Sequence, residues 1–324
     1  MSICVTGGAG YIGAHVVRLL QRAGHEVIVI DDLSYGDAAR VGPSELIQLD
    51  LADTAELPRL QAALDGCTAV VHIAGRKQVG ESVERPAWYY QQNIGGMANL
   101  LLAMQAQDVD RLVFSSSAAV YGQPKVDRVR EDIELQPINP YGESKLVGEW
   151  LVRDAARAWG LRGVNMRYFN VAGAGWDDLG DPAVLNLIPM VLQKLYEHRA
   201  PAIFGDDYPT PDGTCVRDYI HVVDIATAHM IAMDYLERDV RPFDAFNIGT
   251  GAGTSVRQVI EMVGEVTGLD TTPVMEPRRP GDPPVLIGAV DRIEQTFEWK
   301  AQHDLRSIVD SSWRAWQAGP KRIS

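Results

Sequence analysis

Near its N-terminus the chain reads Ser2-Ile3-Cys4-Val5-Thr6-Gly7-Gly8-Ala9-Gly10-Tyr11-Ile12-Gly13, a short apolar run followed by glycines spaced by three. The run predicts a strand, and the apolar period that continues from Ile12 predicts a helix. Gly7 permits a tight turn, Gly10 lets the backbone approach a phosphate, and Gly13 lets the helix pack closely on the strand. Because a helix N-terminus attracts anions, the stretch predicts a nucleotide-binding unit.

The residues that follow indicate which dinucleotide such a unit binds. A second predicted strand, Glu26-Val27-Ile28-Val29-Ile30, ends at Asp31-Asp32. An acid at this point binds the ribose hydroxyls of NAD and repels the 2′-phosphate of NADP. Because no Arg or Lys follows until Arg40, we expect no nearby cation to offset that repulsion. The sequence therefore favours NAD over NADP.

The chemistry is predicted by two later stretches, Ser115-Ser116-Ser117-Ala118-Ala119-Val120-Tyr121-Gly122 and Tyr141-Gly142-Glu143-Ser144-Lys145. Tyr141 and Lys145 are spaced to lie one turn apart on a helix, for which Asn139-Pro140 supplies an N-cap residue and a proline at the first position. A phenol has a pKa of about 10, and an ammonium one turn away favours its ionised form. Tyr141 is therefore a candidate proton acceptor, and a serine at the end of the preceding strand is a candidate to hold the substrate oxygen.

The charge composition argues against some classes of binding partner. The 324 residues include 43 Asp and Glu against 30 Lys and Arg, a formal net charge of −13. This balance argues against a nucleic-acid partner and offers no basic patch to a membrane. The cysteines Cys4, Cys67 and Cys215 lack the spacing of metal ligands, so we expect no metal. Because the first predicted strand starts at residue 2, we expect no signal peptide and a cytoplasmic protein.

Apolar runs alternate with helical stretches through the first half of the chain. The predicted strands lie near 2–6, 26–30, 45–49, 69–73, 111–115 and 163–168. Such alternation is typical of an α/β fold, here a Rossmann-type doubly wound parallel sheet with a smaller α/β substrate-binding lobe. We predict a nucleotide-binding domain over 1–170, to which 221–249 return as a helix at about 222–236 and a strand at Phe243 to Ile248. The smaller lobe is predicted from 171–220 and 250–324.

Further segments in the same order along the chain extend the pattern: Ala74-Gly75-Arg76-Lys77-Gln78-Val79-Gly80-Glu81-Ser82, Arg167-Tyr168-Phe169-Asn170, Ala202-Ile203-Phe204-Gly205, Tyr208-Pro209-Thr210-Pro211-Asp212-Gly213-Thr214-Cys215-Val216-Arg217-Asp218-Tyr219-Ile220-His221-Val222, Asn247-Ile248-Gly249 and Arg278-Arg279-Pro280-Gly281-Asp282. With the glycine, serine and tyrosine stretches, they resemble the UDP-glucose 4-epimerase family of extended short-chain dehydrogenase/reductases. The resemblance runs from residue 5 to about 290, nearly the whole chain.

The resemblance implies an enzyme that interconverts UDP-glucose and UDP-galactose with bound NAD, as a homodimer. Because the hydrogen on sugar C4 is not acidic, the inversion needs hydride transfer to NAD, a 4-keto sugar that turns over in the site, and return of the hydride. The family pattern makes Tyr141 the base, gives Ser117 a hydrogen bond to O4, and places Lys145 on the nicotinamide ribose. Lys145 and the positive nicotinamide are expected to lower the pKa of Tyr141 together.

The resemblance also assigns two sets of binding residues. The cofactor set is Gly7, Gly10, Tyr11, Ile12, Gly13, Asp31, Asp50, Leu51, Ala74, Lys77, Asn93, Tyr141, Lys145 and Tyr168. The substrate set is Lys77, Ser117, Tyr141, Asn170, Asn186, Leu187, Ala202, Phe204, Arg217, Tyr219, Arg279 and Asp282. Leu286 occupies the position that gates sugar size. From the residues alone, Asn186 in a helical segment reads as structural, whereas the resemblance implies a substrate contact, and the two interpretations are weighed equally.

The sequence leaves alternatives open. A 4-epimerase of another UDP-sugar, such as an N-acetylhexosamine, a pentose or a uronic acid, fits nearly as well, and a non-catalytic NAD-binding regulator is a remote alternative. A nucleotide-sugar 4,6-dehydratase needs an acid pair after the serine, where this chain has Ala118-Ala119. The chain also departs from the family pattern at Gly95-Gly96-Met97, Cys215 and Ala289, so local order and cofactor contacts near these positions are open.

Overall fold

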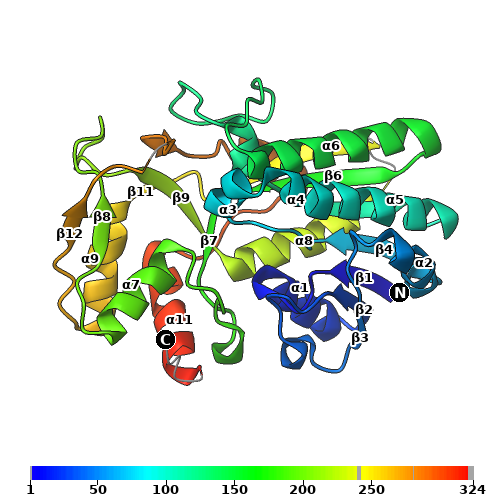
Figure 1. The fold of residues 1–324 in the computed structure, drawn as a ribbon, viewed down its shortest axis with the longest axis horizontal. Helices are drawn as coiled ribbons and strands as arrows, with labels where there is room; N and C mark the ends of the chain where they lie inside the picture. The colour runs from blue at the N-terminus through cyan, green and yellow to red at the C-terminus, as the bar shows by residue number, and fades with distance from the viewer. Residues whose placement is uncertain (1, 239–241, 280, 320–324) are drawn as a thin grey trace.

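Seven apolar runs of the chain pair as one parallel sheet, in the order β10-β6-β5-β4-β1-β2-β3 (Figure 1). This computed structural model describes residues 2–238, 242–279 and 281–319. The strands are β1 (Ser2–Thr6), β2 (Glu26–Asp31), β3 (Glu45–Gln48), β4 (Cys67–His72), β5 (Arg111–Ser117), β6 (Arg162–Tyr168) and β10 (Phe243–Ile248). The predicted doubly wound parallel sheet is confirmed, including the return of the strand at 243–248.

Side chains alternate between the two faces of this sheet, and both faces are covered. In β1, Ile3 and Val5 face one cluster of buried side chains, while Cys4 between them packs in the other. Because helices cover a parallel sheet on both sides, its strands are apolar on both faces. This is why the strands read in the sequence as continuous apolar runs rather than as alternating ones.

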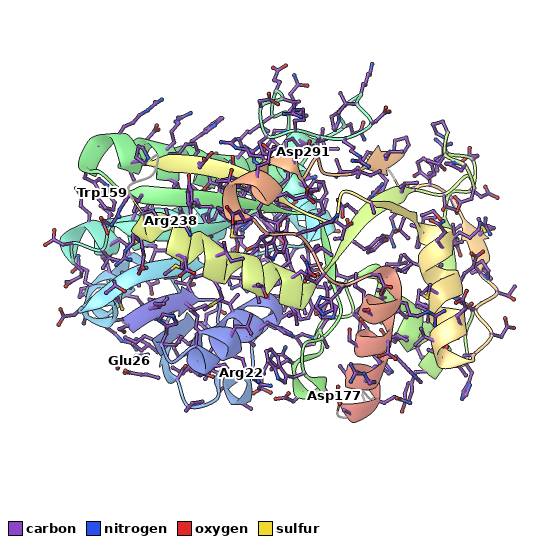
Figure 2. All side chains as sticks on the ribbon, turned by 180° about the vertical axis from the view of Figure 1, so that it is seen from behind. Arg22, Glu26, Trp159, Asp177, Arg238 and Asp291 are labelled. Carbon is purple, nitrogen blue, oxygen red and sulfur yellow. The ribbon has the colours of Figure 1, made fainter. Side chains whose placement is uncertain are left out.

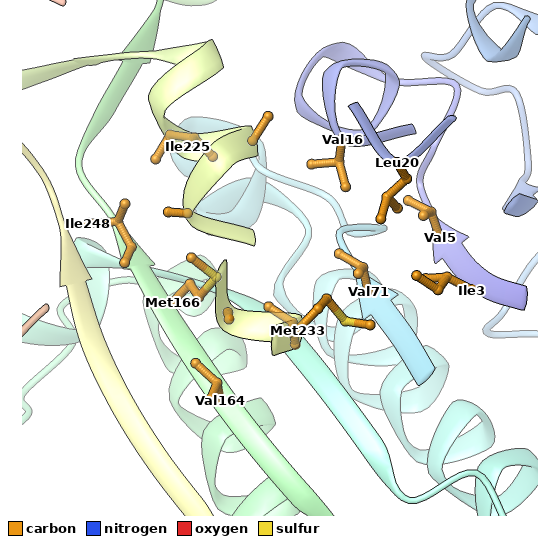
Figure 3. Close-up of a cluster of buried hydrophobic side chains, with 14 of the residues drawn as sticks. Ile3, Val5, Val16, Leu20, Val71, Val164, Met166, Ile225, Met233 and Ile248 are labelled. Carbon is orange, nitrogen blue, oxygen red and sulfur yellow. The ribbon is translucent and has the colours of Figure 1, made fainter. Parts of the chain in front are cut away.

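One face is covered by α1 (Tyr11–Arg22), α8 (Val222–Glu237) and α10 (Asp291–Phe297). Figure 3 shows Val16 and Leu20 of α1 on the same side of β1 and β4 as Met233 of α8, which lies near Val71. The other face is covered by α2 (Leu57–Leu64), α5 (Gly96–Ala106) and α6 (Pro140–Trp159), with the short helices α3 (Val79–Glu84) and α4 (Pro86–Tyr90) beyond the strand ends (Figure 1).

The chain after Tyr168 builds a smaller lobe beside the carboxyl ends of the main strands (Figure 1). Its strands are β7 (Asn170–Ala172), β8 (Ala202–Phe204), β9 (Val216–His221), β11 (Gly253–Ser255), β12 (Val274–Glu276) and β13 (Val285–Leu286). β9 pairs with β7, β11 and β13, whereas β8 pairs with β12. The helices α7 (Leu187–Tyr196), α9 (Val256–Thr267) and α11 (Leu305–Ala318) enclose a separate apolar core.

One stretch assigned to the smaller lobe packs elsewhere. Val290, Ile293, Phe297 and Trp299 belong to the cluster beneath α1 and α8, and the ring of Phe297 lies 4.6 Å from that of Phe246 in β10. The predicted domain boundaries remain a prediction, and these contacts favour moving 290–299 to the side of the large sheet.

Many charged side chains lie at the periphery of the molecule. Figure 2 labels Arg22, Glu26, Asp177, Arg238 and Asp291, all of them exposed. Of the helices described in 2–238, 242–279 and 281–319, none combines the length and apolar character that a membrane crossing requires.

Candidate active site and cofactor cavity

The glycine turn brings the start of α1 against the end of β1. Gly7 has a φ of +71°, in the left-handed region that glycine adopts most easily. A Cβ on Gly13 would fall 2.0 Å from the carbonyl oxygen of Gly7, so the close contact that requires glycine is with the turn itself. Gly10 caps α1 without a side-chain hydrogen bond, which leaves backbone N–H groups at the helix start directed to the cavity beside them.

A cavity runs along the carboxyl ends of β1, β2, β4 and β5, beginning at this turn. Every predicted cofactor residue except Asn93 lines it: Gly7, Gly10, Tyr11, Ile12, Gly13, Asp31, Asp50, Leu51, Ala74, Lys77, Tyr141, Lys145 and Tyr168. A side-chain-free turn facing a helix start, with carboxylates further along the same wall, suits a dinucleotide. The residues present therefore fit NAD, and their individual contacts to it remain predictions.

Asn93 lies behind the wall of the cavity. Its amide nitrogen donates to the carbonyl of Arg76 at 3.0 Å and to the Ser144 hydroxyl at 2.9 Å, and its amide oxygen accepts from the Arg76 N–H at 2.8 Å. The asparagine thus holds the loop after β4 against α6. Asn93 lies in a π-helical turn, Gln91–Gly95. The next residue, Gly96, belongs to the stretch that departs from the family pattern, and it lines the cavity.

The acidic end of the cavity corrects one expectation. Arg76, from the loop after β4, pairs with Asp32 through Nη2 and Oδ2 at 2.7 Å. The expectation of no nearby cation was wrong because it considered only the residues that follow Asp31 along the chain. A parallel sheet places the ends of β2 and β4 at the same edge, on either side of β1. A cation from the other loop therefore reaches the acids.

The catalytic candidates meet where β5 ends. α6 begins as predicted, with the Asn139 side chain accepting from the N–H of Gly142 at 2.8 Å and Pro140 in the first turn. In the protein alone, burial raises the pKa of Tyr141, and the neighbouring Ser117 hydroxyl partly opposes that rise.

Lys145 lies one turn further along the same helix and is buried. Its Nζ donates to the carbonyl of Ser115 at 2.8 Å and lies 5.1 Å from the centre of the Phe114 ring. Burial lowers the pKa of Lys145 to about 8. The joint lowering of the Tyr141 pKa by Lys145 and a bound nicotinamide remains a prediction, since burial governs Tyr141 in the protein alone.

A hydrogen-bonded chain continues from Lys145 into the sheet. The Ser115 hydroxyl lies 2.7 Å from the hydroxyl of Tyr168, which bonds in turn to Nε2 of His229 in α8. Because Nδ1 of His229 bonds to the carbonyl of Ile225, that nitrogen carries the proton and Nε2 accepts from Tyr168. Burial lowers the pKa of His229 to about 4, so its ring is neutral and orients Tyr168.

A second cavity, of about 480 Å³, lies in the smaller lobe. It is lined by most of the predicted substrate residues: Asn170, Asn186, Leu187, Ala202, Phe204, Arg217, Tyr219, Arg279 and Asp282. Leu185 lines both cavities, so the two adjoin. Tyr141 lines the cofactor cavity, whereas Ser117, at the end of β5, is among the lining residues of neither cavity.

Two cations converge on the second cavity. Arg217 is held by Asp282, with Nη2 and Oδ1 3.2 Å apart, and the Arg279 guanidinium lies 3.9 Å from the centre of the Phe204 ring. Asn186 begins α7, and its amide donates to Asp181 at 2.7 Å. A pair of arginines in a cavity of this size suits a diphosphate.

Leu286 lies between the lobes. It pairs with Arg217 in the β9–β13 ladder and packs against the cluster that contains Ala118 and Phe169. The predicted gating residue is thus close to the end of β5, and its effect on sugar size remains a prediction.

The chain is similar to known proteins over most of its length. A model described as the NAD dependent epimerase/dehydratase family matches residues 3–249. The chain belongs to this family.

Relatives of this family member extend the match to nearly the whole chain. A UDP-glucose 4-epimerase from Corynebacterium glutamicum is 43% identical, over 97% of this chain and 95% of its own length. A crystal structure of UDP-glucose 4-epimerase from Brucella ovis in complex with NAD has a TM-score of 0.91 and 39% identity, covering 96% of this chain and 97% of that one. Another, from Stenotrophomonas maltophila with bound NAD and formylated UDP-arabinopyranose, has a TM-score of 0.91 and 40% identity, covering 98% of each chain. The family resemblance predicted from the sequence is confirmed.

The structure of this family member also brings in residues that the sequence analysis had left out of the site. A buried ion pair, Glu149 with Arg167 at 2.7 Å, lies directly behind β5, and Glu149 accepts from the Ser116 hydroxyl at 2.5 Å. His229 and Arg76 are two further residues that the sequence did not place in the site. A glutamate two turns after Tyr141 on the apolar side of α6 was the one sequence signal for this network.

Proposed function

We propose that this chain interconverts UDP-glucose and UDP-galactose by transient oxidation of sugar C4 with bound NAD. The observation that carries the proposal is the pair of Tyr141 and buried Lys145, which line the cavity that fits a dinucleotide, with the Ser117 hydroxyl next to Tyr141. This cavity adjoins a second one that contains two arginines. The family match and the named relatives support the same reaction.

Each of the three side chains has a distinct part in this proposal. Bound NAD would supply the acceptor and donor for the C4 hydride. Tyr141 takes the O4 proton and later returns it, which gives a 4-keto sugar and then the inverted alcohol. Ser117 holds O4 within reach of Tyr141. The Lys145 charge favours the ionised phenol, against the burial that disfavours it.

The second cavity holds the part of the substrate that does not react. Arg217 and Arg279 bind the diphosphate, Asp282 the uridine ribose, and Asn170 and Asn186 the remaining polar groups. Because these anchors lie away from C4, the keto sugar can turn between two faces while its nucleotide stays bound. Leu286 then limits the room in which it turns.

Replacement of Tyr141 by Phe tests the proposal. Because only the phenol oxygen is removed, Tyr141→Phe should retain NAD and thermal stability while its turnover of UDP-galactose falls by about 10²- to 10⁴-fold. Tyr90→Phe is the matched control, since the Tyr90 hydroxyl bonds to Glu143 away from the cavity. Near-normal turnover by Tyr141→Phe, with UDP-glucose followed by chromatography, would refute the assignment of the base.

We also propose that the protein is a cytoplasmic homodimer. Leu102 of α5 and Trp150 of α6 are 53% and 46% exposed, and the two helices lie side by side on the outer face of the molecule (Figure 1). Exposed apolar side chains on neighbouring helices suit a helical interface between two copies. The three buried free thiols, Cys4, Cys67 and Cys215, fit a reducing compartment.

A further inference from the structure

The two acids that end β2 are held in different ways. Asp31 accepts two backbone N–H groups, Oδ2 from Ala9 at 3.0 Å and Oδ1 from Leu33 at 2.9 Å. Asp32 instead accepts three hydrogen bonds from two residues. Its Oδ1 accepts from the N–H and the hydroxyl of Ser34 at 2.9 and 2.6 Å, and its Oδ2 accepts from Nη2 of Arg76 at 2.7 Å.

Arg76 is held firmly in this arrangement. Its side chain is 13% exposed, and its guanidinium lies 5.5 Å from the centre of the Tyr35 ring and 5.2 Å from that of Trp88. Its Nε and Nη2 also donate to Gln92 Oε1, at 3.2 and 3.0 Å. The cation therefore stays in place without depending on Asp32 alone.

The donors that meet Asp32 are those that bind a phosphate. A guanidinium, a backbone N–H and a hydroxyl converge on one carboxylate, and phosphate oxygens accept from the same groups. Asp31, Asp32, Ser34 and Arg76 all line the cofactor cavity. Burial raises the pKa of Asp31, and the charge of Arg76 opposes that rise only in part. For Asp32, burial is outweighed by the hydrogen bonds from Ser34 and by the charge and hydrogen bond of Arg76, so that its pKa is lowered.

We propose that Arg76 and Ser34 form a latent 2′-phosphate subsite that the Asp32 carboxylate occupies, so that Asp32 as well as Asp31 makes the chain selective for NAD over NADP. The inference rests on the proposed function, because it takes the cavity to hold a dinucleotide with its adenosine end at β2. Asp31 keeps its part as the acceptor for the 2′-hydroxyl. Asp32 acts by filling the donors that a 2′-phosphate would use and by repelling its charge.

The test is calorimetry of NAD and NADP binding to the full chain stripped of cofactor. Asp32→Ala should lower the ratio of the NADP to the NAD dissociation constant by tenfold or more, with the NAD constant changed by less than about threefold. Adding Arg76→Met to Asp32→Ala should raise the ratio again, because the main donor to a 2′-phosphate is then missing. Asp32→Asn, which keeps the shape and removes the charge, should give an intermediate ratio and guards against misfolding of the alanine variant.

Two further measurements separate the proposal from simple removal of charge. Asp37→Ala removes an exposed acid from the same loop outside the cavity, and it should leave the ratio unchanged. Binding of NADP to Asp32→Ala should depend more steeply on salt than binding to Asp32→Ala/Arg76→Met, because one phosphate contact is involved.

The proposal is overturned if Asp32→Ala leaves the ratio unchanged, or if the ratio falls equally with and without Arg76. Failure of the premise that the cavity holds a dinucleotide gives a different result, since the unaltered protein would then bind neither NAD nor NADP. Failure of the proposed reaction alone would show as NAD binding without interconversion of UDP-glucose and UDP-galactose.

Discussion

Lys145 carries a charge in a place where water is scarce. Its Nζ is bonded to one backbone carbonyl and faces an aromatic ring, and neither contact replaces a full hydration shell. The lowered pKa, about 8, measures that loss. The ammonium is thus poised to interact strongly with any group that develops negative charge beside it, such as the phenol of Tyr141.

The lowered pKa of Lys145 predicts how stability changes with pH. Between pH 8 and 10.5 the unfolded chain keeps a proton on this lysine that the folded protein has released, so stability rises with pH. The rise attributable to Lys145 is about 3 kcal/mol. Urea unfolding of cofactor-stripped protein at pH 7.5 and pH 10 measures it, with Lys145→Met as the reference that lacks it. Parallel behaviour of the two proteins would show that the lysine is well solvated.

Leu286 predicts the sugar range at the same scale. Its apolar side chain offers an N-acetyl group no hydrogen bond, and burying an unpartnered amide costs about 1–3 kcal/mol, or roughly 5- to 150-fold in rate. Leu286→Ser should therefore raise kcat/KM for UDP-N-acetylglucosamine relative to UDP-glucose, and Leu286→Tyr should lower it. Val285→Ser, on the opposite face of the strand, is the control. An unchanged ratio in both Leu286 variants would place specificity elsewhere.

The sequence predicted site residues well where the backbone dictates the residue type. Gly7 and Gly13 are recognisable because a side chain would collide or strain the turn. Arg76 and His229 escaped prediction because their parts depend on how far a side chain reaches across the sheet. The sequence does not show which partner a long side chain will reach, because an arginine in a loop is solvated in most proteins.

At the scale of elements, β5, β6 and α6 are locked together by the buried pair of Glu149 and Arg167. Their side chains are 4% and 5% exposed, and Arg167 also bonds to the Tyr121 hydroxyl at 3.0 Å. The network holds the strand that ends in Ser117 against the helix that carries Tyr141. The relative position of the Ser117 and Tyr141 hydroxyls therefore depends on Glu149 and Arg167, which do not line the cavity.

Breaking this pair should be costly. Glu149→Gln leaves the Arg167 charge buried without its partner, which typically lowers the free energy of unfolding by about 3–5 kcal/mol. Asp154→Asn, on the exposed side of the same helix, should change stability little. Urea unfolding of the two variants and the unaltered protein provides the comparison, and equal stability of all three would show that the pair is dispensable.

Element positions were predictable where periodicity and capping agree. The strand Phe243–Ile248 matches its prediction because an apolar run marks it. The start of α6 matches because an N-cap residue marks it. The π-helical turn Gln91–Gly95 was not predicted. A π-helical turn has one residue more than an α-helical turn but needs no different residue types, so the sequence does not mark it. Here the turn packs against α6.

At the scale of the molecule, the substrate cavity is assembled from distant segments. Asn170, Phe204, Arg217 and Arg279 reach it from four separate stretches. Family resemblance predicted this set, whereas local patterns could not, because spacing along the chain carries no information on how a lobe closes. For the same reason, the pattern gave no sign that side chains of 290–299 pack in the cluster on the large sheet.

The proposed homodimer makes a prediction for the whole molecule. Leu102→Glu and Trp150→Glu should each shift sedimentation from dimer to monomer at micromolar concentration, because a buried unpaired carboxylate opposes association. Val274→Glu, an exposed apolar position on the smaller lobe, should sediment as the unaltered protein does. A monomer in the unaltered protein would contradict the proposal.

The strand order has a consequence for synthesis on the ribosome. β6 pairs with β10, and α1 packs with α8 in one apolar cluster. Both partners are synthesised late, after a long stretch of the smaller lobe. A nascent chain that has emerged only as far as Tyr168 thus presents an unpaired strand edge and an uncovered apolar helix face. Chaperone demand should peak during this interval and fall once α8 and β10 have left the exit tunnel. The large sheet gains its last strand and the helix that packs against α1 from this same late segment.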